Sequence, residues 1–136
     1  MNVFAEFPIL IPIVAGVISE LTKVLILRIK RQAITHKDFF RSGGMPSGHS
    51  SFAAALSLTM LSQYGAKSPE FTLATAFAII VVIDAIKFRR AAGMHAAALN
   101  QLSKRNHLDE RLGHSPIEVF AGILFGAVIA LFLLSF

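Results

Sequence analysis

Four long apolar stretches constrain this chain more than any other feature of its sequence. They cover about residues 7–29, 46–64, 70–88 and 115–136. A helix that crosses a bilayer needs about 20 apolar residues, with a range of about 17–25, and the first and last stretches meet this length comfortably. The middle two are marginal and contain Ser, Thr, Gln and Asp84, so we expect helices shielded by neighbouring helices or by a second subunit. The sequence therefore predicts an all-α fold, a small integral-membrane helical bundle of about four transmembrane helices.

Two connecting segments add detail to this bundle. The second and third apolar stretches are joined only by residues 64–69, which predicts an antiparallel hairpin, with Ser68 as the N-cap and Pro69 at the first position of the next helix. Residues 89–113 are mixed and polar, and within them 90–102 has helical propensity. We therefore expect a short additional helix on the polar side, and the length of 136 residues predicts a single membrane-embedded domain over 1–136.

The composition supports a membrane protein and excludes several kinds of chemistry. Hydrophobic residues make up 54% of the chain, with 12 Phe, and a mean hydropathy of +0.64 is too high for an ordinary soluble domain of this size. Cys is absent, which excludes disulfides, Cys-ligated zinc and thiol catalysis. The N-terminus has no basic leader and carries Glu6, so we expect no removable signal peptide.

Basic residues are concentrated at the two polar stretches. Of the 13 Lys and Arg residues, five lie near the first stretch, six lie near the second, and Lys23 and Lys67 lie elsewhere. Basic residues that flank apolar spans usually face lipid headgroups, so we expect a membrane and no nucleic acid as the partner. With four crossings both polar stretches lie on one side. The positive-inside rule makes that side cytoplasmic, with both termini outside.

The start of the second apolar stretch has the character of an anion site. Residues 43–49 read Gly-Gly-Met-Pro-Ser-Gly-His. Pro46 suits the first position of a helix, and Ser47, Gly48 and His49 would then fill the first turn. Free backbone N–H groups and the positive end of the helix dipole attract anions there. A second histidine, His114, precedes Ser-Pro at a similar boundary, so the sequence predicts a phosphate site with two histidines on one membrane face.

These motifs resemble a known family. The string Pro-Ser-Gly-His at 46–49 matches the P-S-G-H motif of the type 2 phosphatidic acid phosphatase and vanadium haloperoxidase superfamily. The strings Arg-Arg-Ala-Ala-Gly-Met-His-Ala and Leu-Gly-His-Ser-Pro-Ile-Glu-Val, together with Gly-Gly-Met-Pro-Ser-Gly-His-Ser, look like the small, divergent bacterial branch of that superfamily. The resemblance covers roughly residues 20–130.

The resemblance implies a membrane-embedded phosphatase that acts on a phosphate monoester or diphosphate in a bacterial inner membrane. The place of the site at the headgroup level leads us to expect a lipid-linked substrate, and the positive-inside rule places the site on the cytoplasmic side. His114 would attack phosphorus and form a phosphohistidine, and Glu118, one turn later, would hold the imidazole. His49 would protonate the leaving oxygen. Ser47 and the Gly48 amide would bind phosphoryl oxygens, and arginine would neutralise their charge. The scheme needs no cofactor, and the sequence has no convincing metal-ligand spacing.

The chain departs from the family pattern at its basic residues. The first motif, K-x6-R-P, is absent, and the third, S-R-x5-H-x3-D, is split, because Leu108 stands six positions before His114. Arg89 and His95 have the spacing of its first half, so His95 is the second candidate for the nucleophile. The candidates for phosphate-binding cations are Arg89 and Arg90, which alternatively anchor the helix at the cytoplasmic face, and Lys23, Lys37 and Arg41.

Several of these residues also have structural interpretations. Ser115, Pro116 and Glu118 form a capping box with proline at the first helical position, so Glu118 alternatively only caps a helix. Gly122 and Gly126 have the small-xxx-small spacing of helix packing.

Acidic residues in the apolar stretches have two interpretations as well. An intramembrane acid such as Asp84 is a functional candidate, and the structural alternative is an ion pair with Lys87 or Arg90. Glu20 and Lys23, one turn apart, can pair in the same way, or Lys23 can reach the phosphate.

Two other functions share the same helix starts. The first is a non-catalytic membrane protein that binds an anionic lipid headgroup or phosphate, as a scaffold or a transporter subunit. The second is haloperoxidase chemistry with vanadate. Four short helices leave much apolar surface, which favours a homodimer.

Overall fold

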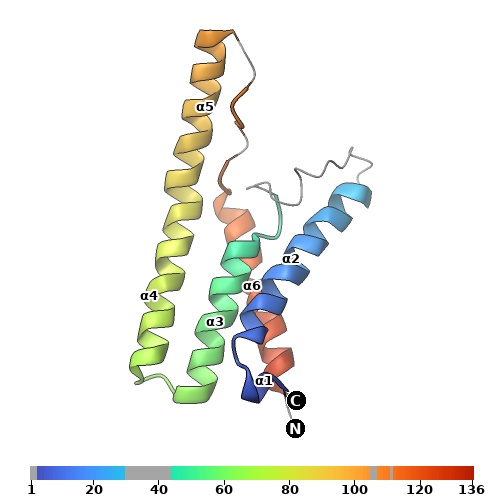
Figure 1. Cartoon of the computed structure of the whole chain (residues 1–136), viewed down its shortest axis with the longest axis vertical. Coiled ribbons are helices and arrows are strands. Elements are labelled where there is room, and N and C mark those ends of the chain that lie inside the picture. Colours follow the sequence, from blue (N-terminus) through green and yellow to red (C-terminus); the bar gives the residue numbers. More distant parts are fainter. Residues whose placement is uncertain (1–2, 30–43, 105–106, 111) are drawn as a thin grey trace.

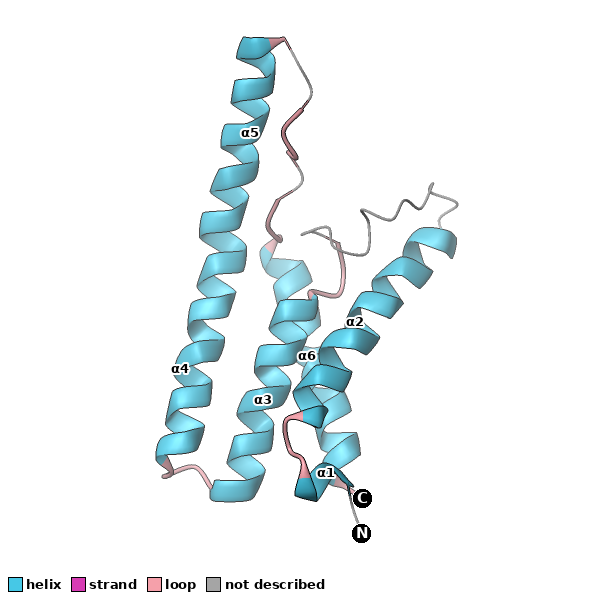
Figure 2. Ribbon diagram, viewed as in Figure 1, coloured by secondary structure: helices cyan, strands magenta, loops and turns pink. Residues whose placement is uncertain are grey.

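The computed structural model describes residues 3–29, 44–104, 107–110 and 112–136. Every regular element among them is a helix (Figure 2), which confirms the all-α prediction. The elements are α1 (Val3–Glu6), α2 (Leu10–Ile29), α3 (Gly48–Tyr64), α4 (Pro69–Ile83), the π-helical turn η2 (Asp84–Phe88), α5 (Arg89–Ser103) and α6 (Pro116–Leu134).

Helix α3 is the centre of the bundle. It packs against α2, α4 and α6, and α2 also packs against α6 (Figure 1). The helices α3 and α4 form the predicted hairpin, and its turn is built as expected: Ser68 caps α4 by accepting from the backbone N–H of Phe71 (3.1 Å), and Pro69 is the first helical residue. Three helices, α2, α4 and α6, are therefore held together by contacts with the central helix α3.

The predicted separate helix over 90–102 is instead the continuation of α4. Helix α4 passes through η2 into α5 without a break, so that one helix runs from Pro69 to Ser103 over 35 residues. Figure 1 shows that α5 extends well beyond the ends of α3 and α6. The residues at the junction, Asp84–Phe88, carry no Gly or Pro that would end a helix.

Proline 46 is not the first residue of α3, and that prediction was wrong. Helix α3 begins at Gly48, and Ser47 is its N-cap, in an extended conformation with φ −74° and ψ 115°. The Ser47 hydroxyl accepts from the backbone N–H of Ser50 (3.4 Å), so it satisfies one of the free donors at the helix start. Gly48 and His49 still lie in the first turn, as predicted.

Small residues allow α6 to lie very close to α3. A Cβ atom at Gly122 would stand 2.5 Å from the carbonyl oxygen of Ser47, and one at Gly126 would stand 2.1 Å from that of Ser51. Both distances are far shorter than a contact between real atoms. The small-xxx-small pattern therefore has the packing role predicted for it.

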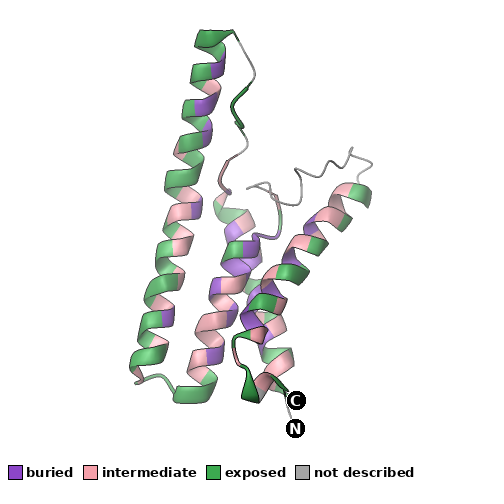
Figure 3. Cartoon of the chain, viewed as in Figure 1, coloured by how far each residue is buried: buried purple, intermediate pink, exposed green. Residues whose placement is uncertain are grey.

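The outer surfaces of the helices suit a lipid environment. Large apolar side chains point outward, with Leu73 73% exposed and Val128 66% exposed, and Figure 3 shows the exposed faces along α4 and α6. In the described part of the chain three helices are long and apolar enough to cross a membrane, namely α2, the α4–α5 helix and α6. The central helix α3, with 17 residues, is shorter but is within the lower limit for a crossing.

Candidate functional site

The site lies at one end of the bundle, where α2 ends and where α3 and α6 begin; α1 and the carboxyl end of α6 lie at the opposite end (Figure 1). A cavity of about 230 Å³ opens there. His49 from α3, Arg89 from the first position of α5 and His114 from the segment before α6 all line it. The remaining lining residues are Ile80, Val81, Asp84 and Ala85. The fold thus brings four of the predicted candidates, His49, Asp84, Arg89 and His114, to one cavity.

The backbone fixes His114 at the wall of this cavity. Its N–H donates to the carbonyl oxygen of Ala85 (3.1 Å), in the π-helical turn. The preceding Gly113 has φ +85°, in the left-handed region that favours glycine, and a Cβ there would meet the backbone nitrogen of Arg90 at 2.4 Å. His114 is only 4% exposed, whereas His49 across the cavity is exposed.

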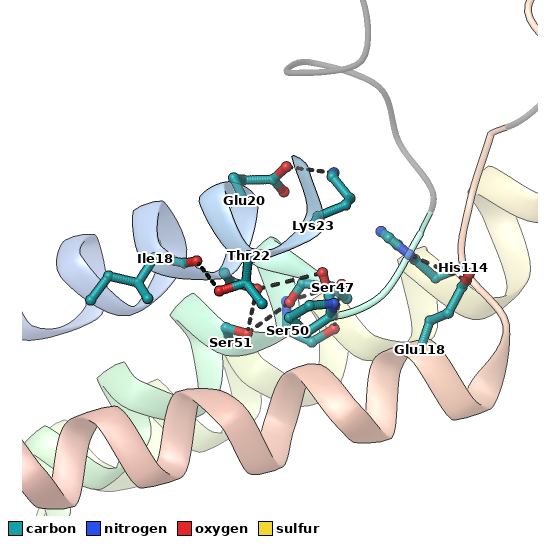
Figure 4. Close-up of polar contacts among 11 residues, drawn as sticks. Ile18, Glu20, Thr22, Lys23, Ser47, Ser50, Ser51, His114 and Glu118 are labelled. Carbon is teal, nitrogen blue, oxygen red and sulfur yellow. Dashed lines mark hydrogen bonds and ion pairs between the residues drawn. The ribbon is translucent and has the colours of Figure 1, made fainter. Parts of the chain in front are cut away.

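Glu118 caps α6 and also lies beside His114. Its Oε2 accepts from the backbone N–H of Ser115 (2.8 Å), and the Ser115 hydroxyl accepts from the backbone N–H of Glu118, which completes the capping box. The same Oε2 lies 3.5 Å from Nδ1 of His114 (Figure 4). Among the described residues, Nδ1 of His114 has no hydrogen-bond partner, so its contact with the Glu118 carboxylate is electrostatic. A carboxylate beside Nδ1 favours the proton on that nitrogen, which leaves the lone pair on Nε2.

Burial and the neighbouring charged groups do not all shift the pKa of His114 in the same direction. Burial is the largest influence and lowers the pKa of His114 below its ordinary value, while the Glu118 carboxylate raises the pKa and the Lys23 ammonium lowers it. The net direction is downward. An imidazole with a lowered pKa is uncharged at neutral pH and becomes protonated only as the pH falls through that pKa. His114 is therefore available as a neutral nitrogen base under ordinary conditions.

Asp84 pairs with Arg89, not with Lys87 or Arg90 as the sequence suggested. The Arg89 Nε donates to Asp84 Oδ2 at 2.6 Å, and both side chains are a little over 40% exposed. Asp84 stands five positions before Arg89, and the π-helical turn between them widens the helix. Both members of the pair line the cavity, together with His49 and His114.

Lys23 is buried near the same end of the bundle. It is 3% exposed and forms the predicted ion pair with Glu20, one turn earlier on α2 (Figure 4). Its side chain passes close to Gly44, where a Cβ would be 3.0 Å from Lys23 Cδ. Lys23 does not line the His49–His114 cavity, but its charge is near enough to act on the pKa of His114.

Ser47 and Gly48 are used in packing. Ser47, Ser50, Ser51 and Ser19 are fully buried and form a cluster (Figure 4), in which Ser51 Oγ lies 3.0 Å from Ser19 Oγ and 2.8 Å from the carbonyl oxygen of Gly122. A Cβ at Gly48 would be 2.3 Å from Glu20 Oε1. Neither Ser47 nor Gly48 lines the cavity.

The other predicted residues do not meet at this cavity. Arg90 and His95 lie exposed on α5 and do not line it, and Lys37 and Arg41 lie outside the described residues. Among the residues that the structure describes, no three His, Asp or Glu side chains are placed to share a metal ion. Sequence reasoning missed the contribution of Asn100, a buried amide on α5. The available signal was its polar side chain directly after three alanines and a leucine.

Comparison with known proteins gives two matches. The model of a family described as "Divergent PAP2 family" matches residues 4–129. An uncharacterized membrane protein of Bacillus subtilis (strain 168), YuiD, is 33% identical over 156 aligned residues, which cover 100% of this chain and 99% of that protein. No solved structure matches the chain.

Proposed function

Because the chain is an integral membrane protein that belongs to the divergent PAP2 family, we propose that it hydrolyses a phosphate monoester or diphosphate through a phosphohistidine intermediate. One observation carries the proposal: His49, His114 and Arg89 come from three segments and line one cavity. A nucleophile, a proton donor and a cation around one space are the groups that phosphoryl transfer needs.

The first step forms the intermediate. Nε2 of His114 attacks phosphorus, the bond between phosphorus and the leaving oxygen breaks, and His49 gives its proton to that oxygen. Glu118, beside Nδ1, stabilises the positive charge that the imidazole acquires. The Arg89 guanidinium faces the phosphoryl oxygens and offsets their charge in the transition state.

The second step regenerates the protein. His49, now neutral, accepts a proton from water as the water oxygen attacks phosphorus. The bond between phosphorus and His114 Nε2 breaks, inorganic phosphate leaves, and the Nε2 lone pair returns to the imidazole. Both histidines end in their starting protonation states, so the cycle is balanced.

The place of the cavity supports a lipid-linked substrate. It lies at the ends of helices that continue, in the sequence, into the two stretches that hold most of the basic residues, and such ends lie at the level of lipid headgroups. By the positive-inside rule this end faces the cytoplasm, and in a bacterium the membrane would be the inner one.

A second candidate is a non-catalytic protein that binds phosphate or an anionic headgroup. The observation in its favour is that Ser47 is fully buried and Gly48 is packed against the Glu20 carboxylate, so two of the phosphate contacts implied by the family are occupied. Such a protein would bind phosphate esters and release no phosphate from them.

The leaving group offers a test of the role of His49. We expect His49→Ala to slow the first step about 10²–10⁴-fold for an alkyl phosphate, whose leaving oxygen must be protonated. For p-nitrophenyl phosphate, whose leaving group departs without a proton, we expect the first step to slow less than about 10-fold. Because His49 also activates water in the second step, the measurement is release of the leaving alcohol or phenol in the first turnover of the purified protein in detergent.

The wild-type protein with both substrates is the control for this comparison. An equal loss for both substrates in first-turnover release of the leaving group would contradict a proton-donor role for His49. No release by the wild-type protein from any ester or lipid diphosphate would favour the binding protein.

A further inference from the structure

Helix α5 buries one stripe of residues, and that stripe faces the chain segment that returns from α5 to α6. The buried residues are Gly93, Ala96 and Asn100, which recur every three or four positions along one side of the helix. Figure 3 shows this stripe facing the return segment, and α5 has its main helix contact with η2. In the described part of this segment, Leu108, Glu110 and Leu112 contact the stripe.

Asn100 joins α5 to the return segment by three hydrogen bonds. Its Nδ2 donates to the carbonyl oxygen of Leu108 (3.0 Å) and to Glu110 Oε1 (2.7 Å), and its Oδ1 accepts from the backbone N–H of Leu108 (3.2 Å). The side chain is 3% exposed. A buried amide that satisfies both backbone groups of one residue fixes that residue as a neighbouring strand would.

Close packing continues from Leu108 toward His114. A Cβ at Gly93 would stand 2.7 Å from the carbonyl oxygen of Glu110 and 3.0 Å from that of Leu112. Gly113 lies against the backbone of Arg90, and the N–H of His114 donates to the Ala85 carbonyl oxygen. The described parts of the segment thus lie along the α5–η2 helix, and His114 is the residue at which it leaves that helix.

We propose that Asn100 is a positioning residue that sets the place of His114 by holding the return segment in register on α5. The proposal rests on the function proposed above. Asn100 does not line the cavity, so it acts through the segment. Arg89 begins the helix to which Asn100 belongs, so the Asn100 contact, together with the hydrogen bond from His114 to Ala85, sets the distance between the cation and the nucleophile. A displacement of a reacting group by about 1 Å can cost about 10²-fold in rate.

The test compares Asn100→Ala with wild type. We expect kcat to fall about 10–100-fold with KM changed less than about 3-fold, because the substrate-binding groups stay and the nucleophile shifts. The exposed neighbour Gln101→Ala is the matched control and should behave as wild type. Gly93→Ala, which pushes the same segment away from the same face of α5, should reproduce the Asn100→Ala phenotype.

A titration of His114 separates positioning from general damage. Burial lowers the pKa of His114, so movement of the ring toward water should raise the pKa toward 6.5. The charged and titratable groups around the ring are Glu118, Lys23, His49 and the Asp84–Arg89 pair, and the substitution changes none of them. Histidine-labelled protein followed by NMR, with His114→Ala to assign the signal, measures this pKa without turnover.

An unchanged kcat and an unchanged His114 pKa in Asn100→Ala, with the fold intact by circular dichroism, would overturn the proposal. A rise in KM alone would overturn it as well, because it would place Asn100 in substrate binding. If the wild-type protein releases no phosphate, the proposed function fails, while the NMR titration still decides whether Asn100 positions His114.

Discussion

Replacing His114 with alanine should abolish phosphate release. The imidazole is the only nucleophile that the described residues place in the cavity with its Nδ1 beside a carboxylate and its Nε2 available. Loss of a covalent nucleophile commonly lowers kcat by several orders of magnitude, and we expect about 10³-fold or more. The measurement is phosphate release from p-nitrophenyl phosphate and from a lipid diphosphate, with protein recovered at the wild-type elution volume.

Two other histidines make this result specific. His107→Ala removes an exposed imidazole outside the cavity and should leave activity at the wild-type level. His95→Ala removes the second candidate for the nucleophile and should also retain activity, since His95 is exposed on α5 away from the cavity. Activity that survives in His114→Ala but is lost in His95→Ala would exchange the two assignments.

Gly126→Ala should destabilise the bundle more than the addition of a methyl group at any other position of α6. The new Cβ would stand 2.1 Å from the Ser51 carbonyl oxygen and 2.6 Å from Ser51 Cα. Backbone atoms cannot rotate away as a side chain can, so α6 must separate from α3. Overpacking of this kind lowers the free energy of unfolding by about 1–3 kcal/mol. The measurement is unfolding by denaturant in mixed micelles, where both the midpoint and the free energy of unfolding should fall.

Gly16→Ala is the matched control for this substitution. Gly16 lies in α2, and a Cβ there would meet Phe52 Cβ at 3.5 Å, an ordinary van der Waals contact. Since alanine is favoured over glycine in a helix by about 1 kcal/mol, Gly16→Ala should leave stability unchanged or raise it. Equal stability of the two variants would contradict the close approach of α6 to α3.

The parts of the fold that follow from local chemistry were predictable from the sequence. Ser68 with Pro69 and Ser115 with Pro116 carry complete start signals, and both helices begin where those signals place them. The start of α3 was misplaced because Pro46 and Ser47 each carry a signal, and the hydroxyl cap of Ser47 decides the position.

The long α4–α5 helix was less accessible to prediction. Polarity changes sharply near Asp84, which suggests a boundary, yet nothing there breaks a helix, so the backbone continues through a π-helical turn. That turn depends on tertiary contacts such as the hydrogen bond from His114 to Ala85, which no local pattern reveals.

The candidate site was predictable in its histidines and less so in its supports. His49 and His114 each stand at a helix start with a recognisable motif, and both line the cavity. The partner of Asp84 and the contacts of Asn100 depend on how a helix and a distant segment align, and sequence spacing alone does not supply that alignment.

The central claim is that phosphate passes through His114, and trapping the intermediate tests it most directly. The wild-type protein is mixed briefly with a phosphate ester labelled at phosphorus, quenched in alkali, where phosphohistidine is stable, and mapped by mass spectrometry of its peptides. We expect the label on His114, and no labelled peptide from His114→Ala. Label on a different residue, or continued phosphate release with no labelled protein at any time, would contradict the account.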